Sequence, residues 1–384
     1  MASPAKEASP VAAAHRPVRM REVAELAGVG TMTVSRVLNG TAHVAEETSR
    51  RVAEAIEQLH YLPNPVARAL RGSSSHTIGV LLPYLHDPFF ATCAHAVNAV
   101  AQQLGYSMIL TTTNEDPGAE LEEIRQMVRR QVDGLIVIPA HRPKRSARTE
   151  AATLATLAAL GSIPVVTLDR PMPEADFDRV EVENEAGGAL GADHLIAHGY
   201  RDICFLGLTR DLHTMQLRHK GYQRAMTRAG LAATAHFSCD SQASVTALMR
   251  TMFAGSSPPR ALFTANGLVT RYALKALDEL GISLPSQVAV VGFDDLELSD
   301  LLASPLTVLR QPTRELGREA AELLFYRLAK GAQREAKYTR VLPVELVVRE
   351  SCGCVAPAFR PNSRVEGGSE DEDARQAGGR SASA

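Results

Sequence analysis

Three polar residues stand directly after short apolar runs that are typical of buried strands. Asp169 follows "VVTL", Asn266 follows "ALFTA" and Asp294 follows "VVGF". Carboxylates and an amide at strand ends can bind the vicinal hydroxyls of a sugar, because charge-assisted hydrogen bonds select geometry. An aromatic residue of "DPFF", Phe89 or Phe90, could stack on a ligand ring. These residues are the candidates for a small-molecule pocket.

A repeating order of strands and helices must position these residues. From about residue 76, apolar runs such as "TIGVLLP" and "DGLIVIPA" alternate with amphipathic stretches such as "FFATCAHAVNAVAQQLG". This alternation predicts an α/β fold with parallel sheets and right-handed crossovers. The rhythm resumes at "RDICFLGL", which indicates two similar lobes. Ligands of open α/β sheets bind outside the carboxyl ends of the strands, so the pocket is expected between the lobes.

The preceding segment has a different pattern. Two short amphipathic runs flank "GVG" in "VAELAGVGTMTVSRVLNG", and neither is long enough to be a stable helix alone. We expect helices over 20–27, 31–39 and 46–60, with Gly28 in a left-handed turn. Two short helices with a glycine-containing turn are the unit that enters a DNA major groove. The predicted inward residues are Val23, Ala27, Val34, Val37, Leu38, Val52, Ile56 and Leu59.

The opposite face of the second short helix is expected to be exposed. It carries Thr31, Met32, Ser35 and Arg36. The run "GVGTMT" also begins like a dinucleotide-binding fingerprint. Thr33 replaces its third glycine, and the run follows a helix rather than a strand, so we reject that interpretation.

Composition narrows the class of protein. The 384 residues exceed one typical domain, and 45% apolar with 22% charged residues is usual for a globular protein. A net charge of −2 means that any nucleic-acid contact must come from a local patch. Five scattered cysteines fit a reducing cytosol better than a disulfide framework. We find neither a secretion signal nor a long apolar span, so a cytoplasmic protein without membrane contact is expected.

Residues 20–90 resemble the start of a LacI/GalR family transcriptional regulator. The resemblance is carried by "MREVAELAGVGTMTVSRVLN", "PNPVARAL" and "TIGVLLPYLHDPFF". The later stretches "VVGFDD", "LTVLRQP" and "LPVELVVRESC" resemble the periplasmic-binding-protein-like core of that family. The resemblance implies an all-α helix-turn-helix head, a hinge and a two-lobed α/β core. It implies chain crossings between the lobes near Glu183, Arg310 and Lys337.

The implied division of the chain follows from these matches. It consists of a disordered arm (1–18), a DNA-binding head (19–63), a hinge helix and linker (64–75), lobe 1 (76–183 and 311–336), lobe 2 (184–310 and 337–356), and a disordered acidic tail (357–384).

Residue roles follow from the same resemblance. Thr31, Met32 and Arg36 match base-reading positions, and Arg36 has the chemistry for a bidentate contact to guanine. Arg218 matches an effector contact and joins Phe90, Asp169, Asn266 and Asp294 in the predicted pocket. Ala67 and Leu70 match hinge residues that enter the minor groove. The positions that match phosphate contacts are Thr33, Ser35, Asn39, His43 and Thr48.

The other clusters of potentially reactive residues do not predict a metal site or a catalytic site. His194 and His198 in "HLIAH" share a helix face, but Leu195 replaces the glutamate of a zinc protease, so an ordinary histidine pair is favoured. Cys352 and Cys354 in "CGC" are too few for a closed zinc site. The sequence contains no nucleophile elbow and no Walker loop. We therefore expect no catalytic residue, no cofactor and no metal.

The resemblance implies a sequence-specific DNA-binding regulator, a repressor, whose operator affinity is controlled by a sugar or sugar derivative. Its expected partners are pseudo-palindromic double-stranded operator DNA, the small-molecule effector and a second copy of the chain. The alternative is a sugar-binding receptor built on the same core, without a DNA role. Such a receptor has no use for residues 19–72.

Overall fold

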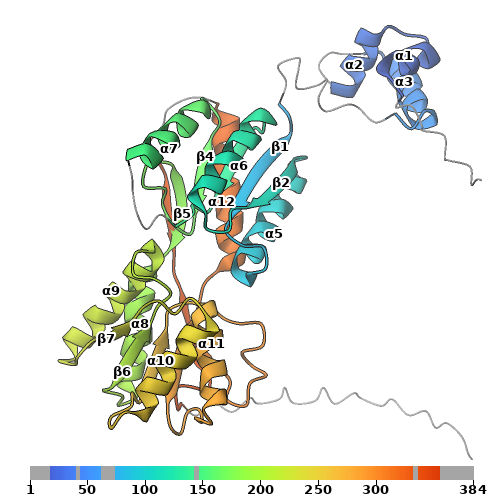
Figure 1. The fold of residues 1–384 in the computed structure, drawn as a ribbon. Coiled ribbons are helices and arrows are strands. Elements are labelled where there is room, and N and C mark those ends of the chain that lie inside the picture. Colours follow the sequence, from blue (N-terminus) through green and yellow to red (C-terminus); the bar gives the residue numbers. More distant parts are fainter. Residues whose placement is uncertain (1–17, 40–43, 62–73, 142–146, 332–335, 355–384) are drawn as a thin grey trace, which may run out of the picture. The chain divides into compact units, whose positions relative to one another are not determined.

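The computed structural model describes residues 18–39, 44–61, 74–141, 147–331 and 336–354. The chain forms two compact units: Met1–Thr77 with Gln131–Asp133, and the remainder from Ile78 onward. We refer to residues 18–61 of the first unit as the head and to the second unit as the core (Figure 1).

Three helices form the head: α1 (Met20–Ala27), α2 (Thr31–Asn39) and α3 (Glu46–Gln58). The three predicted helices are confirmed, but α3 ends before His60, which has a φ of 46°. Of the predicted inward residues, four are buried and four pack half-buried against them. The buried ones are Val23, Ala27, Val34 and Val52, and the half-buried ones are Val37, Leu38, Ile56 and Leu59.

The turn between α1 and α2 is held from α3. Gly28 has a φ of 63°, a conformation that glycine adopts without strain. The Arg51 guanidinium donates from Nε to the carbonyl of Ala27 at 3.1 Å and from Nη2 to that of Gly28 at 3.2 Å. Arg51 thereby satisfies carbonyls that the end of α1 leaves without helical partners. This contact fixes the angle between the two short helices.

The first lobe of the core is built on one six-stranded sheet in the order β11-β5-β4-β3-β1-β2. Its pairs β1–β3, β3–β4, β4–β5 and β5–β11 are parallel. The strands are β1 (Thr77–Leu82), β2 (Ser107–Thr112), β3 (Gly134–Val137), β4 (Val165–Leu168), β5 (Asp178–Val182) and β11 (Thr339–Leu342). The helices are α5 (Pro88–Gln103), α6 (Pro117–Arg129), α7 (Ala147–Ala159) and α12 (Thr313–Lys330).

The second lobe repeats this design with the order β12-β10-β9-β8-β6-β7. Its strands are parallel except for the edge strand β12, which is antiparallel to β10. The strands are β6 (Ile203–Leu206), β7 (Thr234–His236), β8 (Ala261–Thr264), β9 (Ala289–Phe293), β10 (Thr307–Arg310) and β12 (Glu345–Val347). The helices are α8 (Asn184–Ala197), α9 (His213–Arg228), α10 (Gln242–Ala254) and α11 (Gly267–Glu279).

Three segments connect the lobes. The chain leaves the first sheet between β5 and α8, returns between β10 and α12, and leaves again between β11 and β12. The third crossing was expected near Lys337, and this expectation is wrong. Residues Thr339–Leu342 still pair with β5 in the first sheet, so the crossing follows Leu342. The sequence did not predict this strand because three of its four residues are exposed at the sheet edge, so it lacks the apolar run of a buried strand.

No helix in the described part of the chain is long and apolar enough to cross a membrane.

Candidate functional site

The head presents most of the predicted base-reading side chains to solvent. Thr31 and Arg36 are exposed, and Met32 is 66% exposed despite its apolar side chain. Within the described residues Arg36 forms no ion pair, whereas Arg21 is paired with Glu25. An unpaired guanidinium beside an exposed apolar side chain on one helix face is suited to contact with base edges.

The residues predicted to contact phosphates differ in their exposure to solvent. Thr33 and Thr48 are half-buried at the surface of α2 and α3. The expectation that Ser35 lies on the exposed face is wrong, because Ser35 is only 9% exposed. Ser35 follows the fully buried Val34 by one residue, a rotation of about 100°, which leaves it at the edge of the buried face. Asn39 lies in α2 but its side chain is not described, and His43, Ala67 and Leu70 lie outside the described residues.

In the core, the Arg218 side chain of α9 is held by three contacts within the second lobe. Its Nε donates to Asn184 Oδ1 at 2.7 Å, and its Nη1 donates to the carbonyl of Ala265 at 2.7 Å. Its guanidinium also lies over the ring of Phe293, 3.7 Å from the centroid. All three partners come from elements far from Arg218 in the sequence.

Close packing of α8 against α9 brings Arg218 to Asn184. A Cβ at Gly188 would lie 2.0 Å from the carbonyl oxygen of Arg218, and a Cβ at Gly221 would lie 2.0 Å from that of Glu185. Only glycine permits this approach, since a side chain would overlap the facing backbone. The glycines of "NEAGG" and "RHKGY" therefore position the guanidinium.

Asp169 and Asp294 occupy strand ends, as predicted. Asp169 follows β4 and Asp294 follows β9, with φ angles of 69° and 80°. Asp294 Oδ2 accepts from the backbone N–H of Gly267 at 2.9 Å, and its Oδ1 accepts from Gln311 Nε2 at 2.5 Å. The turn therefore aims the Asp294 carboxylate at the start of α11 and at the segment that returns to lobe 1.

The charges of the two lobes act on one another. Burial raises the pKa of Asp169 to about 6, against the opposing effect of Arg170 and Arg218. The carboxylate of Asp294 adds to this rise. Burial lowers the pKa of Arg218, and this effect is partly offset by the two aspartates. Burial also raises the pKa of Asp87, with a contribution from Asp294 of the other lobe.

The remaining predicted pocket residues have structural roles as well. Asn266 caps α11, because its Oδ1 accepts from the N–H of Val269 at 3.0 Å. Its amide N–H groups have no acceptor within the described chain. Phe90 is 8% exposed and belongs to the core of lobe 1. The neighbouring Phe89 is only half-buried and contacts Phe90 edge to face at 5.2 Å. Of the two, Phe89 is therefore more accessible to a ligand.

Sequence reasoning missed a buried guanidinium beside Asp169. Arg170 is 4% exposed, and its Nη2 contacts Glu115 Oε1 at 2.6 Å. Its Nε lies 3.7 Å from Asp169 Oδ2, too far for a hydrogen bond, and neither Nε nor Nη1 has a hydrogen-bond partner in the described structure. His141 Nε2 is likewise buried without a partner, while the His141 backbone N–H donates to Glu115. The adjacency of Arg170 to Asp169 in "LDR" was the available signal.

We name Asp169, Arg170, Arg218 and Asp294 the interlobe cluster. It combines two carboxylates with two buried guanidinium groups, which lie just after the strands β4 and β9 and in the second turn of α9. Two surface hollows, of about 300 and 450 Å³, are lined by other residues. The first is lined by Thr167, residues 171–177 and Arg179, and the second by residues 181–186 with Leu217, Arg224 and Val341. No side chain of the interlobe cluster lines either hollow.

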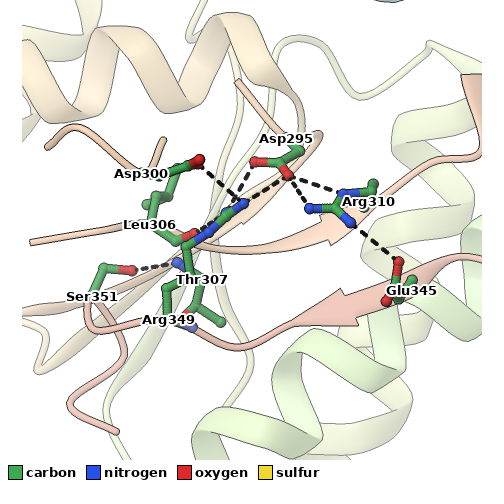
Figure 2. A network of polar contacts seen from close by, with 8 residues as sticks. All are labelled: Asp295, Asp300, Leu306, Thr307, Arg310, Glu345, Arg349 and Ser351. Atoms are coloured by element: carbon green, nitrogen blue, oxygen red, sulfur yellow. Dashed lines mark hydrogen bonds and ion pairs between the residues drawn. The ribbon is translucent and has the colours of Figure 1, made fainter. Parts of the chain in front are cut away.

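A second polar network supports the Asp294 side of this cluster (Figure 2). Asp295 Oδ2 lies 2.7 Å from Arg310 Nη2 and 2.9 Å from Arg349 Nη2. Burial opposes ionisation of Asp295, but the hydrogen bonds from Arg349 and Arg310 outweigh it and lower the pKa. Arg310 directly precedes Gln311, so the network fixes the segment that holds Asp294.

Two family models match this chain. The model of the bacterial regulatory proteins of the lacI family matches residues 19–64, which include the head. The model of the periplasmic binding protein-like domain matches residues 192–352, within the core.

Relatives match over nearly their whole length. The HTH-type transcriptional repressor PurR of Aliivibrio salmonicida is 32% identical over 338 residues, which are 86% of this chain and 98% of the relative. PurR of Haemophilus influenzae strain PittEE is 31% identical over 336 residues, with shares of 86% and 98%.

Solved structures of transcriptional regulators are similar to this chain over nearly their whole length. The lac repressor dimer bound to operator and the anti-inducer ONPF gives a TM-score of 0.77 at 29% identity, covering 88% of this chain and 99% of that chain. The complex of the transcriptional regulator CelR with cellobiose gives 0.63 at 29% identity, with shares of 88% and 100%. The relatives are repressors rather than enzymes, and the matches include the head, which a receptor without a DNA role would not need. The chain belongs to the lacI family of bacterial regulatory proteins and is a DNA-binding transcriptional repressor.

Proposed function

We propose that this repressor binds a pseudo-palindromic operator as a homodimer, and that a sugar or sugar derivative bound at the interlobe cluster controls its operator affinity. The function is exerted in the cytoplasm, where bacterial DNA lies. The observation that carries the effector site is the buried, incompletely paired guanidinium of Arg170 beside the carboxylate of Asp169.

The chemistry of the cluster favours a polyhydroxylated ligand. Burying guanidinium N–H groups without acceptors is costly, so a site that retains them is suited to a ligand that supplies oxygen atoms. A sugar hydroxyl can accept from a guanidinium and donate to a carboxylate at the same time. Neighbouring hydroxyls of one ring could therefore satisfy Arg170 and Asp169 together. On the lobe 2 side, Asp294 and the free amide N–H groups of Asn266 extend this set.

One structural neighbour supports a sugar, because the transcriptional regulator CelR was solved in complex with cellobiose. Phe89 or Phe90 at the start of α5 could stack on the face of a sugar ring, and Phe89 is the more accessible.

Ligand binding would be transmitted through the connections between the lobes. Asp169 belongs to lobe 1, whereas Arg218 and Asp294 belong to lobe 2, so one ligand that contacts all three favours one arrangement of the lobes. Gln311, which binds Asp294, lies in the segment that crosses back to lobe 1. A ligand changes operator affinity only as far as it binds the two arrangements unequally.

In the head, we propose that Thr31, Met32 and Arg36 contact bases and that Thr33, Asn39, His43 and Thr48 contact phosphates. We propose no phosphate contact for Ser35, because this residue is buried. Ala67 and Leu70 would enter the minor groove at the centre of the operator.

The effector proposal is tested by thermal-shift screening with sugars, sugar acids, sugar phosphates and purines. A ligand at 100 times its dissociation constant stabilises the protein by about 2.7 kcal/mol. We expect a sugar-class ligand to do so and to alter operator affinity. Asp294→Asn should lose both effects and keep ligand-free operator binding, whereas Asp278→Asn, exposed on α11, should behave like the native protein. A normal response of Asp294→Asn would place the pocket elsewhere, and stabilisation by purines alone would refute the sugar class.

A further inference from the structure

Four side chains with metal-binding atoms converge where the described core ends. His194 lies in the last turn of α8, and His198 directly follows that helix. Cys354 Sγ lies 3.6 Å from His194 Nε2 and 3.0 Å from His198 Nε2. Cys352 Sγ lies 2.9 Å from Cys354 Sγ. The sequence separates the two pairs by more than 150 residues, so only the fold reveals the cluster.

The local backbone is built to aim both thiols at the histidines. His194 and His198 are four residues apart and share one face of the helix end, with ring centroids 4.6 Å apart. Gly353 has a φ of 82°, and a Cβ there would lie 2.8 Å from the hydroxyl of Tyr200. This left-handed glycine turns Cys354 back beside Cys352. Cys352 itself is fully buried and contacts Thr307 Oγ1 at 3.1 Å.

We propose that His194, His198 and Cys354 bind one Zn²⁺ ion, with Cys352 available as the fourth ligand. Tetrahedral zinc has Zn–S bonds of about 2.3 Å and Zn–N bonds of about 2.0–2.1 Å, which place sulfur and nitrogen ligands about 3.6 Å apart. Cys354 Sγ lies 3.6 Å from His194 Nε2 and 3.7 Å from His198 Nδ1, both close to this value, and the three residues offer ligand atoms that lie within 4.8 Å of one another. On binding, each ligating thiol releases its proton to solvent and each imidazole coordinates in its neutral form.

The position of the cluster suggests what the ion does. It joins the C-terminal end of α8 to the segment that follows β12, the last strand in the described chain. The opposite end of the same helix carries Asn184, which holds Arg218. Zinc would therefore secure the second lobe at the end of α8 that lies away from the interlobe cluster.

The experiment uses untagged full-length protein under reducing conditions, stripped with EDTA and then titrated with ZnCl₂. We expect one zinc per chain by elemental analysis and a rise in melting temperature on zinc addition. Co²⁺ in place of Zn²⁺ should give the absorption of a tetrahedral site with a thiolate-to-cobalt charge-transfer band.

Variants of the proposed zinc ligands are compared with variants of a histidine and a cysteine outside the cluster. His198→Ala and Cys354→Ala should each lower zinc affinity at least about tenfold, because loss of even a residue that only supports a ligand has that effect. His95→Ala, another exposed helix histidine, and Cys239→Ala, another cysteine of lobe 2, should bind zinc normally. His198 is exposed, so its variant should fold, which the zinc-free melting temperature checks. The proposal is overturned if the native protein binds no zinc, if the ligand variants bind it as well as the controls, or if reducing-condition mass spectrometry shows a Cys352–Cys354 disulfide instead.

Discussion

Asp169 and Asp294 occupy equivalent positions in the two lobes. Each follows the third strand of its sheet, β4 in one order and β9 in the other, and each has a left-handed backbone conformation. The negative charge of Asp294 contributes to the raised pKa of Asp169. A carboxylate of lobe 2 therefore repels the ionised carboxylate of lobe 1. Holding these two charges close together without a ligand lowers the free energy of unfolding, and the pH dependence of that free energy should reveal the effect.

The first consequence is a stability that falls between about pH 4 and pH 6. Asp169 has a pKa of about 6 in the folded protein, against about 3.9 in an unfolded chain. The folded state therefore binds the proton more tightly, and ionisation of Asp169 destabilises the fold as the pH rises through this window. Asp169→Asn should remove this loss and be more stable than the native protein at pH 7, by up to about 3 kcal/mol.

The measurement is the difference in unfolding free energy between variant and native protein from pH 4 to pH 8. Asp278→Asn, at an exposed site on α11, is the control and should show no such difference. A variant that is less stable at pH 7, with an unchanged pH profile, would show that the Asp169 carboxylate is stabilised rather than strained.

Sequence patterns located Asp169 and Asp294 because they lie at strand ends, where local hydrophobicity and parallel pairing determine the position. The partners that set the electrostatics were not predictable in this way. Glu115 reaches Arg170 over 55 residues, Asn184 reaches Arg218 over 34, and Ala27 reaches Arg51 over 24. Periodicity reports which face of an element is buried, not which distant side chain meets it. It also misplaced Ser35, which lies at the border between two faces of α2.

The second prediction concerns base reading by Arg36. Arg36→Ala should weaken operator binding by about 1–3 kcal/mol and relax the preference for one base pair in each half-site. The reason is that an exposed, unpaired guanidinium can bind guanine bidentately. Fluorescence anisotropy on operator and random DNA measures both effects. Arg21→Ala, an exposed arginine in α1, should leave specificity unchanged. An equal loss on operator and random DNA would mean that Arg36 contacts only phosphate.

The third prediction is a dimer formed by the core. Leu298 and Leu301 are 64% and 80% exposed on the segment after β9, which Arg349 ties down through Asp295 and Asp300. Exposed leucines on a segment held by these ion pairs are suited to a two-fold interface with a second copy. Light scattering at micromolar concentration should give a dimer mass. Leu301→Asp should shift the mass toward the monomer, whereas Leu104→Asp, exposed at the end of α5, should not.

A tetramer mass would contradict this prediction. The sequence after residue 356 is rich in glycine, serine and acidic residues, and no heptad seam can be drawn through it. We therefore predict no coiled coil in this segment that would join two dimers.

The fourth prediction concerns Leu70, which lies outside the described residues. The segment "NPVARALRG" is too short to form a stable helix alone, so we expect it to become helical only on the operator. Leu70 would then insert between base pairs in the minor groove and bend the duplex. Insertion costs a few kcal/mol of base unstacking, so it should be most effective at a flexible pyrimidine–purine step.

Leu70→Ala should therefore reduce both DNA bending and operator affinity, with little change in the melting temperature of the free protein. Circular-permutation gel shifts report the bend, and anisotropy reports the affinity. Replacing the central pyrimidine–purine step of the operator by a stiff A-tract should weaken the native protein more than the variant, because only the native side chain must open the step. If Leu70 instead docks the head onto the core, the variant melts several degrees lower while the DNA bend is unchanged. That result would exclude insertion of Leu70 between base pairs.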